Sequence, residues 1–234
     1  MPNHDLRVGA IIQARMSSQR LPGKSLRSIA GRPVLQYVVE RLQHCDRIEA
    51  MVVATSTDVA DDPIHAFCRF HGIDCIRGEL NDVAGRFCRA LSVHPMDAFV
   101  RVCGDRPLLD QALVARGIDL FRAGDVDVVT NACPPTFPPG ETVEVVRTDT
   151  FRSAYPYMEA GSDREHVMPL FYRHPKRFHV ENFCADRDYS GVRLVLDTES
   201  DARVVEGIVR RMTREHWTYP IDEVVSLYHQ PSLL

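Results

Sequence analysis

The sequence lacks the patterns that mark metal, redox and membrane proteins. Its seven cysteines include no Cys-x-x-Cys pair and its ten histidines no His-Glu-x-x-His motif, which argues against zinc ribbons, thioredoxin-type centres and zinc or iron sites. We expect the cysteines to be buried, reduced thiols in a cytoplasmic protein. No apolar run approaches the roughly 18 residues of a membrane span, and the polar N-terminus does not resemble a signal peptide.

The sequence also has no excess of positive charge. It contains 28 Lys and Arg against 32 Asp and Glu, a net charge of -4, and its pI is near 6.2. A nucleic-acid-binding surface needs a dense basic face, so we expect no nucleic-acid partner. With 234 residues, 44% of them hydrophobic, the chain is long enough for one large α/β domain or two small ones.

Up to residue 131, short apolar runs alternate with amphipathic helical stretches. Strands are predicted over 7–14, 50–56, 74–78, 98–104 and 125–131, and helices over 32–45, 61–72, 81–91 and 110–124. This alternation predicts a mainly parallel sheet with helices on both faces. Ligands of such sheets bind at the carboxyl ends of the strands, so the loops after Ala14, Ser56 and Gly104 are the expected binding region.

The second part of the chain opens with a proline-rich break over 132–140 and a strand-like run over 141–147. We expect 132–147 to leave the sheet as an arm or lid. Beyond it, the pattern predicts helices near 149–159, 163–173, 199–212 and 221–230, and strands over 177–183 and 192–198. No repeat or linker divides the chain, so 1–234 is read as a single domain.

The stretch Gly9 to Leu26, GAIIQARMSSQRLPGKSL, ends in Gly-Lys-Ser like an ATP-binding P-loop. Ser18 stands where the first glycine of that motif belongs, and no periodic helix starts at Lys24, so a P-loop is not predicted. The loop still carries Arg15, Arg20 and Lys24 and no acid. Arginine and lysine bind phosphate oxygens, and hydroxyls such as those of Ser17 and Ser18 add hydrogen bonds. The alternative is a solvated basic loop on a structural turn.

Two aspartates follow strand-like runs. Asp105 comes directly after 98–104, and Asp197 ends the apolar run over 192–198. Because Mg²⁺ is held by a few carboxylates plus phosphate oxygens, the pair predicts a magnesium site beside a bound polyphosphate. The alternative for each is a turn or helix-capping role.

Several of these segments together resemble a known family. They are IIQARMSSQRLPGKSL, VVATSTD, RGELNDVAGRF, VRVCGDRPLLD, REHVMPLFYRHP and LVLDTESD. Their order and spacing are similar to those of SpsF-type spore-coat polysaccharide proteins, relatives of CMP-Kdo synthetases and acylneuraminate cytidylyltransferases. The resemblance implies a Rossmann-like, GT-A-like nucleotidyltransferase fold. It also implies transfer of CMP from CTP to a sugar acid with release of pyrophosphate, Mg²⁺ as cofactor and a homodimer.

The resemblance assigns roles to individual residues. Arg15, Ser17, Arg20 and Lys24 would bind the triphosphate, with Arg15, Lys24 and Asp105 as the catalytic residues. Asp105 and Asp197 would bind Mg²⁺. The cytosine would be bordered by the stretches that contain Thr55, Asp58, Asp82 and Arg86.

The chain departs from the family pattern at two places. Arg106 stands where the family commonly has cysteine, and Pro139 and Thr142 replace two acids. Arg106 can contact phosphate or an anionic acceptor, or point into solvent. If 132–147 shapes the acceptor pocket, the acceptor differs from the usual one, although Glu141 and Glu144 can compensate.

The segment REHVMPLFYRHP is a candidate for acceptor contacts through Arg164, Glu165, His166 and Arg173; the alternative is a connecting helix.

Three other functions compete with cytidylyl transfer. Asp125-x-Asp127 offers the pattern by which glycosyltransferases hold the metal of a nucleotide-sugar, but this enzyme class has less need of a triphosphate loop. A non-catalytic scaffold would require a broken site, whereas the phosphate-binding and metal-binding residues are all present. An ATP kinase rests on Gly-Lys-Ser alone.

Overall fold

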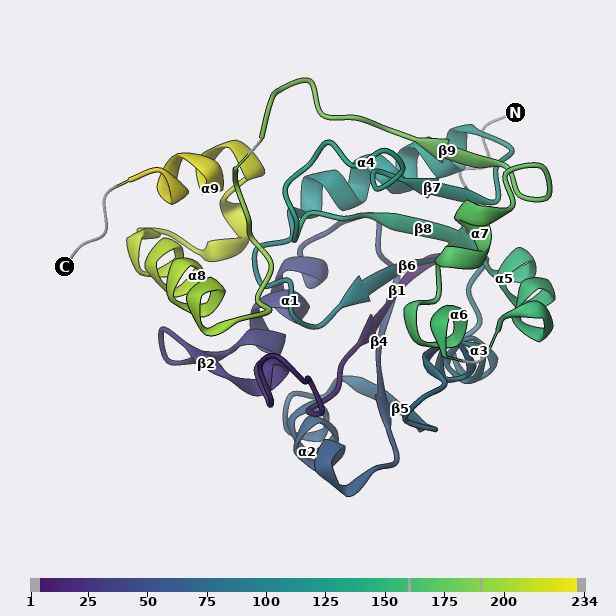
Figure 1. Cartoon of the computed structure of the whole chain (residues 1–234), viewed down its shortest axis with the longest axis horizontal. Helices are drawn as coiled ribbons and strands as arrows, with labels where there is room; N and C mark the ends of the chain where they lie inside the picture. Colours follow the sequence, from purple (N-terminus) through teal and green to yellow (C-terminus); the bar gives the residue numbers. More distant parts are fainter. Residues whose placement is uncertain (1–4, 160, 190, 231–234) are drawn as a thin grey trace.

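The computed structural model describes residues 5–159, 161–189 and 191–230. Its centre is a seven-stranded sheet with the strand order β5-β4-β1-β6-β8-β7-β9 (Figure 1). The strands are β1 (Val8–Gln13), β4 (Ala50–Ser56), β5 (Asp74–Gly78), β6 (Ala98–Cys103), β7 (Val128–Thr130), β8 (Glu144–Arg147) and β9 (Val180–Asn182). Every pairing is parallel except those of β8, which runs antiparallel to β6 and to β7. The predicted mainly parallel sheet is confirmed.

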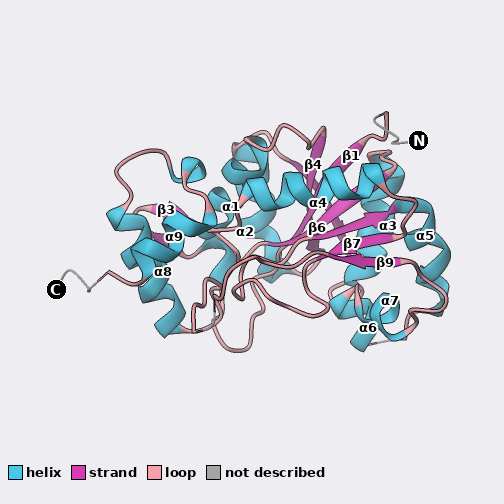
Figure 2. Ribbon diagram, turned by 90° about the horizontal axis from the view of Figure 1, so that it is seen from above, coloured by secondary structure: helices cyan, strands magenta, loops and turns pink. Residues whose placement is uncertain are grey.

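Helices cover both faces of the sheet, as Figure 2 shows for α4 on one side and α6 and α7 on the other. The α-helices are α1 (Val34–Gln43), α2 (Asp62–Phe70), α3 (Val83–Val93), α4 (Gln111–Ala123), α5 (Thr148–Ala154), α6 (Ser162–His166), α7 (Pro169–Arg173), α8 (Glu199–Arg211) and α9 (Ile221–Tyr228). Along β1, Ala10 and Ile12 pack with α1, α2 and α4, whereas Ile11 packs with α3, α5 and α7. This alternation explains why β1 is one unbroken apolar run: both of its faces are buried.

A third apolar cluster lies beside the sheet. It joins the hairpin of β2 (Ser28–Ile29) and β3 (Arg32–Pro33) to α8 and α9, which lie on the left of Figure 1. The hairpin and these two helices surround the segment 192–198, whose side chains Val192, Leu194 and Leu196 are all buried. The amino-terminal loop region and the end of the chain are thereby brought together.

Three predictions of secondary structure are wrong. Residues 144–147 are strand β8 inside the sheet rather than part of an arm, because β8 inserts between β6 and β7. The run 192–198 is extended but is not a strand, because its backbone bonds to loops: Leu194 N–H donates to the Pro139 carbonyl (2.7 Å) and Leu196 N–H to the Asp105 carbonyl (3.2 Å). The helix predicted over 163–173 breaks at Val167, whose φ is 71°.

Smaller differences concern helix ends and thiols. The helix predicted from residue 81 begins two residues later, at Val83, and Asp82 caps it by accepting the Gly85 N–H. The seven cysteines are free, as expected, but Cys133 and Cys184 are exposed rather than buried. No helix within the described ranges is both long and apolar enough to cross a membrane.

Candidate active site

A pocket of about 480 Å³ opens where β1 and β6 end. Its lining includes eight of the residues predicted from the sequence: Arg15, Ser18, Arg20, Lys24, Arg86, Asp105, Glu165 and His166. The carboxyl edge of a parallel sheet is the binding region expected for this fold class. The structure therefore gathers the cationic loop, one of the two aspartates and part of the REHV segment around a single cavity.

The loop after β1 is held open by its own backbone rather than by a helix. Gly23 has a φ of 74°, a left-handed conformation that favours glycine. It precedes η1 (Lys24–Leu26), a single 3₁₀ turn, and α1 begins only at Val34. Ser25 Oγ donates to the Arg15 carbonyl (3.4 Å), which ties the two ends of the loop. The expectation that this loop is not a P-loop is confirmed, because no α-helix starts at Lys24.

A buried aspartate that was not singled out in the sequence also anchors this loop. Asp61 accepts a hydrogen bond from the Met16 N–H (2.7 Å) and one from the Ser56 hydroxyl (2.5 Å). It therefore joins the loop after β1 to the carboxyl end of β4. In the sequence, Asp61 is indistinguishable from an ordinary residue at the start of a helix.

The ammonium group of Lys24 lies between the carboxylates of Asp105 and Asp197. Lys24 Nζ contacts Asp105 Oδ2 and lies 2.8 Å from Asp197 Oδ1, and the three side chains are only 15–16% exposed. Burial alone would lower the pKa of Lys24, but the two carboxylates outweigh it and hold that pKa above its ordinary value. Lys24 therefore stays protonated and brings a positive charge to the pocket that it lines.

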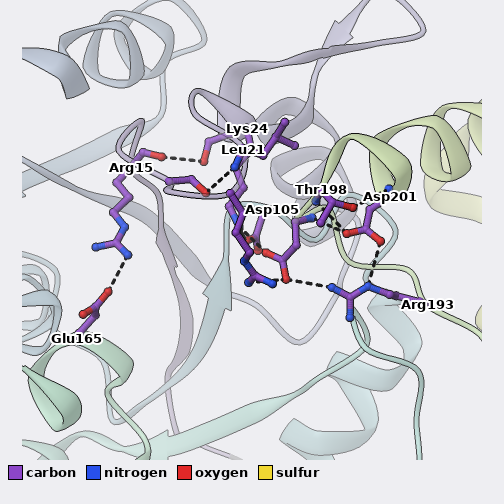
Figure 3. Close-up of polar contacts among 12 residues, drawn as sticks. Arg15, Leu21, Lys24, Asp105, Glu165, Arg193, Thr198 and Asp201 are labelled. Carbon is purple, nitrogen blue, oxygen red and sulfur yellow. Dashed lines mark hydrogen bonds and ion pairs between the residues drawn. The ribbon is translucent and has the colours of Figure 1, made fainter.

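Asp197 has two further cationic partners. Arg20 lies 2.9 Å and Arg193 3.1 Å from Asp197 Oδ2. Burial raises the pKa of Asp197, yet Lys24 and these arginines together hold it below its ordinary value. Arg193 also pairs with Asp201 (3.0 Å), which forms a capping box with Thr198 at the start of α8 (Figure 3). Thr198 and Asp201 therefore cap α8, and the Asp197 carboxylate stays available to the site.

On the opposite wall, Arg15 pairs with Glu165 of α6. The distance from Arg15 Nη2 to Glu165 Oε1 is 2.7 Å, and both side chains are more than one-third exposed (Figure 3). His166 follows and also lines the pocket. An ion pair this exposed contributes little to stability, so Arg15 can exchange Glu165 for another anion.

Of the residues predicted to border the cytosine, Arg86 lines the pocket, whereas Thr55 and Asp58 do not. Arg86 lines the pocket and donates to the carbonyls of Glu79 and Leu80, at 2.6 and 2.9 Å. Thr55 is fully buried. Asp58 caps the short helix η2 (Val59–Asp61).

Several other predicted site residues have structural partners. Asp82 accepts from the Tyr155 hydroxyl (2.6 Å) and lies 3.5 Å from Arg164. Arg106 is partly exposed and donates to the Thr142 carbonyl (3.0 Å). Ser17 is exposed, and these residues are not among those that line the pocket.

Glu144, predicted to bind the acceptor, is buried in the sheet and paired with Arg101 at 2.8 Å. Its second oxygen accepts from the Tyr172 hydroxyl (2.7 Å). Arg173, the remaining candidate, pairs with the buried Asp163 (2.7 Å).

The Asp125-x-Asp127 pattern lies elsewhere. Both residues precede β7, so they lie at the amino edge of the sheet, opposite the pocket. The Asp127 carboxylate accepts from the Thr150 hydroxyl (2.5 Å) and from the His179 N–H (2.9 Å). The pattern that favoured a glycosyltransferase thus has a structural role.

The pocket also contains Ala14 and Gly104, after which the binding loops were expected to begin, and five residues that were not singled out in the sequence: Gln13, Gln19, Ser25, Val83 and Cys103. Gln13 and Cys103 are the last residues of β1 and β6. In the sequence, each looks like an ordinary residue at the end of a strand. The strand-end rule that located Asp105 applies equally to Gln13, which is the one signal that pointed to it.

The aspartates form a suitable partial site for a divalent ion. Asp105 Oδ1 is buried without a hydrogen-bond partner in the described part of the chain, so one carboxylate oxygen is free to bind a cation. Within the described ranges, no group of three or more His, Cys, Asp or Glu side chains is arranged to hold a metal. Two carboxylates completed by phosphate oxygens are the usual protein environment of Mg²⁺.

Comparisons with known proteins identify the family of this chain. The family model described as cytidylyltransferase matches residues 9–213. An uncharacterised protein of Methanocaldococcus jannaschii is 30% identical over 202 residues, which cover 85% of this chain and 82% of that one. The spore coat polysaccharide biosynthesis protein SpsF of Bacillus subtilis is 27% identical, with 86% and 85% covered.

The 3-deoxy-manno-octulosonate cytidylyltransferase 2 of Hydrogenovibrio crunogenus is 36% identical over half of this chain and 47% of its own length. Among solved structures, a cytidylyltransferase from Leptospira borgpetersenii superposes with a TM-score of 0.89 at 27% identity, covering 95% of this chain and 93% of that one. A CMP-Kdo synthetase solved with CTP shares the fold, with a TM-score of 0.67 at 16% identity over 88% and 99% of the two chains. The chain belongs to the cytidylyltransferase family and is a nucleotidyltransferase with the Rossmann-like fold of that family.

Proposed function

We propose that the protein transfers CMP from CTP to a hydroxyl of a sugar acid or related surface-glycan precursor and releases pyrophosphate. One observation carries the proposal: the Lys24 ammonium lies between Asp105 and Asp197 at the floor of a pocket whose loop also presents Arg15 and Arg20. Cations and carboxylates in this arrangement suit a triphosphate bound with a divalent ion.

In the proposed reaction, the acceptor oxygen attacks the α-phosphorus of CTP. A new oxygen–phosphorus bond forms, the bond to the bridging oxygen breaks, pyrophosphate leaves, and the hydroxyl proton passes to solvent or a nearby base. Lys24, Arg15 and Arg20 hold the β- and γ-phosphates and stabilise the charge on the leaving pyrophosphate. This catalysis is mostly positioning and electrostatic stabilisation.

Asp105 and Asp197 would hold a divalent cation, which we propose is Mg²⁺. When bound, the cation neutralises phosphate charge and polarises the α-phosphate. The unpaired, buried Oδ1 of Asp105 supports this assignment. A mycobacterial protein of the same fold, at 18% identity, was solved with manganese, so Mn²⁺ is the alternative ion to test.

The acceptor class is proposed from the site and from relatives together. Several relatives act on 3-deoxy-manno-octulosonate by name, and SpsF is named for polysaccharide biosynthesis. Beside Arg15, the α6 wall offers Glu165 and His166, side chains that can bond the hydroxyls of a sugar. A sugar acid fits a wall that carries groups of both charges.

The test is a thermal-shift titration with Mg²⁺ against CTP, UTP, ATP, GTP and a panel of UDP- and GDP-sugars. A ligand that binds only the folded state raises the unfolding midpoint according to its concentration over Kd. We expect CTP to raise it selectively, and pyrophosphate release to follow when 3-deoxy-manno-octulosonate and other sugar acids are added. A midpoint that responds to a nucleotide-sugar and not to CTP would refute the proposal.

We also propose a cytoplasmic homodimer, as the family resemblance implies. Light scattering on the purified chain should then give twice the monomer mass of 26.5 kDa; a monomer at micromolar concentration would refute it.

A further inference from the structure

A buried polar network lies behind one wall of the pocket. Arg101 of β6 is 10% exposed at its side chain and pairs with Glu144 of β8, which is 4% exposed, at 2.8 Å. Tyr172 donates to the other oxygen of Glu144 (2.7 Å) and lies 3.1 Å from the Thr130 hydroxyl. A buried ion pair with these extra hydrogen bonds has a fixed geometry, and breaking it is costly.

The network ends at the pocket through one residue. Arg101 Nε donates to Gln13 Oε1 at 2.9 Å, and Gln13 lines the pocket. A guanidinium has only donors, so the amide must turn its oxygen toward Arg101. Its NH₂ group is therefore directed away from Arg101, and Nε2 has no hydrogen-bond partner among the described residues.

We infer that Gln13 is a substrate-binding residue whose NH₂ group donates to an oxygen of the bound substrate, and that Arg101, clamped by Glu144, is the positioning residue that fixes this orientation. The inference rests on the proposed function. The oxygen belongs either to CTP or to the sugar acid, and the experiment distinguishes the two. Glu144, which the sequence resemblance placed at the acceptor, acts here through Arg101 rather than by contact.

The direct readout is the side-chain amide signal of Gln13 in a ¹⁵N–¹H NMR spectrum, identified by its loss in Gln13→Glu. Backbone amides of the loop from Arg15 to Lys24 report nucleotide binding independently. We expect Mg²⁺ with CTP to move the loop signals. The Gln13 amide signal should move in one of two steps: when CTP is added, or when 3-deoxy-manno-octulosonate is added together with CMP. Loop signals that move while Gln13 stays unchanged in both steps would overturn the inference alone. Loop signals that never move would remove the proposed function, and the inference with it.

Affinity measurements on variants provide a second test. In Gln13→Glu, one carboxylate oxygen still accepts from Arg101, but the other, an anionic acceptor, replaces the NH₂ donor of glutamine. We expect Kd for the ligand that moves the amide signal to rise about tenfold or more, and Gln13→Met to lose less. Gln43→Glu, which adds the same charge on the exposed side of α1, is the matched control and should be unchanged.

Arg101→Lys separates positioning from general stability. Lysine cannot hold both Gln13 and Glu144 as the guanidinium does, so its loss of affinity should match that of Gln13→Met. The double variant should lose no more than either single one, because both remove the same oriented donor. Additive losses would show that Arg101 acts only on the fold, and ligand-free unfolding midpoints of all variants check that each remains folded.

Discussion

The pairing of Lys24 with both aspartates has a measurable consequence when the lysine is removed. In Lys24→Met, Asp105 loses its one cationic partner in the described structure, while its second oxygen is already buried and unpaired. Asp197 keeps Arg20 and Arg193. Breaking a fully buried pair costs about 3–5 kcal/mol. Because these side chains are 15–16% exposed, we expect a loss of about 2 kcal/mol, or a midpoint lower by about 4–8 °C.

The same variant tests whether Lys24 and a divalent ion share the carboxylates. An ion bound to both aspartates would share their carboxylates with the Lys24 ammonium, and a divalent and a monovalent cation about 4 Å apart repel each other by about 8 kcal/mol at an effective dielectric constant of 20. Free Mg²⁺ should therefore bind the wild-type protein weakly until a triphosphate draws Lys24 away. In Lys24→Met, the ion meets two uncompensated carboxylates, and millimolar Mg²⁺ should restore most of the lost midpoint.

The assay is thermal unfolding without nucleotide, with and without Mg²⁺ at constant ionic strength. Arg27→Met is the matched control, because Arg27 pairs with Glu199 at 34% and 52% exposure and should change stability by less than about 1 kcal/mol. The double variant Lys24→Met with Asp105→Asn should regain stability and lose its response to Mg²⁺. If Mg²⁺ stabilises the wild-type protein as much as Lys24→Met, the lysine and the ion do not compete, and the reasoning fails.

Three further predictions concern turnover, affinity and pH. Asp105→Asn should abolish CTP-dependent pyrophosphate release while the far-ultraviolet circular dichroism stays native; normal turnover would remove Asp105 from the metal site. Glu165→Gln should lower Kd for CTP by about two- to fivefold, because Arg15 no longer has a competing carboxylate; weaker binding would show that Glu165 supports the nucleotide site. Burial raises the pKa of Glu141 from 4.5 to about 8, so folding takes up a proton between these values and stability should fall by up to about 1.4 kcal/mol per unit as pH rises through that window. Glu141→Gln should flatten this part of the stability–pH curve measured by urea unfolding; an unchanged slope would place its origin elsewhere.

The sheet could be predicted from the sequence wherever strands are buried on both faces. The predicted range of β4 matches the structure, because a parallel strand covered by helices reads as a short apolar run between polar turns. The range of β5 also matches, although this strand is at the edge of the sheet and is only partly buried. The placement of β8 could not be predicted in this way. Its run was recognised, but its insertion between β6 and β7 depends on long-range pairing that leaves no local signal.

The segment 192–198 shows the opposite failure. It alternates buried apolar residues as a strand does, yet the N–H groups of Leu194 and Leu196 bond to loop carbonyls. Periodicity indicates which side chains are buried, not which backbone groups the segment pairs with.

The cations and aspartates of the site were predictable because charge at a strand end is conspicuous. Gln13 had only the strand-end signal and Asp61 had none, since a neutral residue that ends a strand and an acid near a helix start fit ordinary local structure.

The segment 192–198, which is not a strand, matters for function because it positions Asp197 relative to Asp105. Asp105 follows a rigid central strand, whereas Asp197 belongs to a segment held by loops and by the cluster around α8 and α9. One backbone bond joins Asp105 to the residue before Asp197: Leu196 N–H donates to the carbonyl of Asp105 at 3.2 Å. This bond and the packing of the fully buried Leu196 hold the backbones of the two aspartates near each other, and the Lys24 ammonium bridges their carboxylates. A change in the packing of α8 or α9 can thus alter the site without touching any residue that lines the pocket.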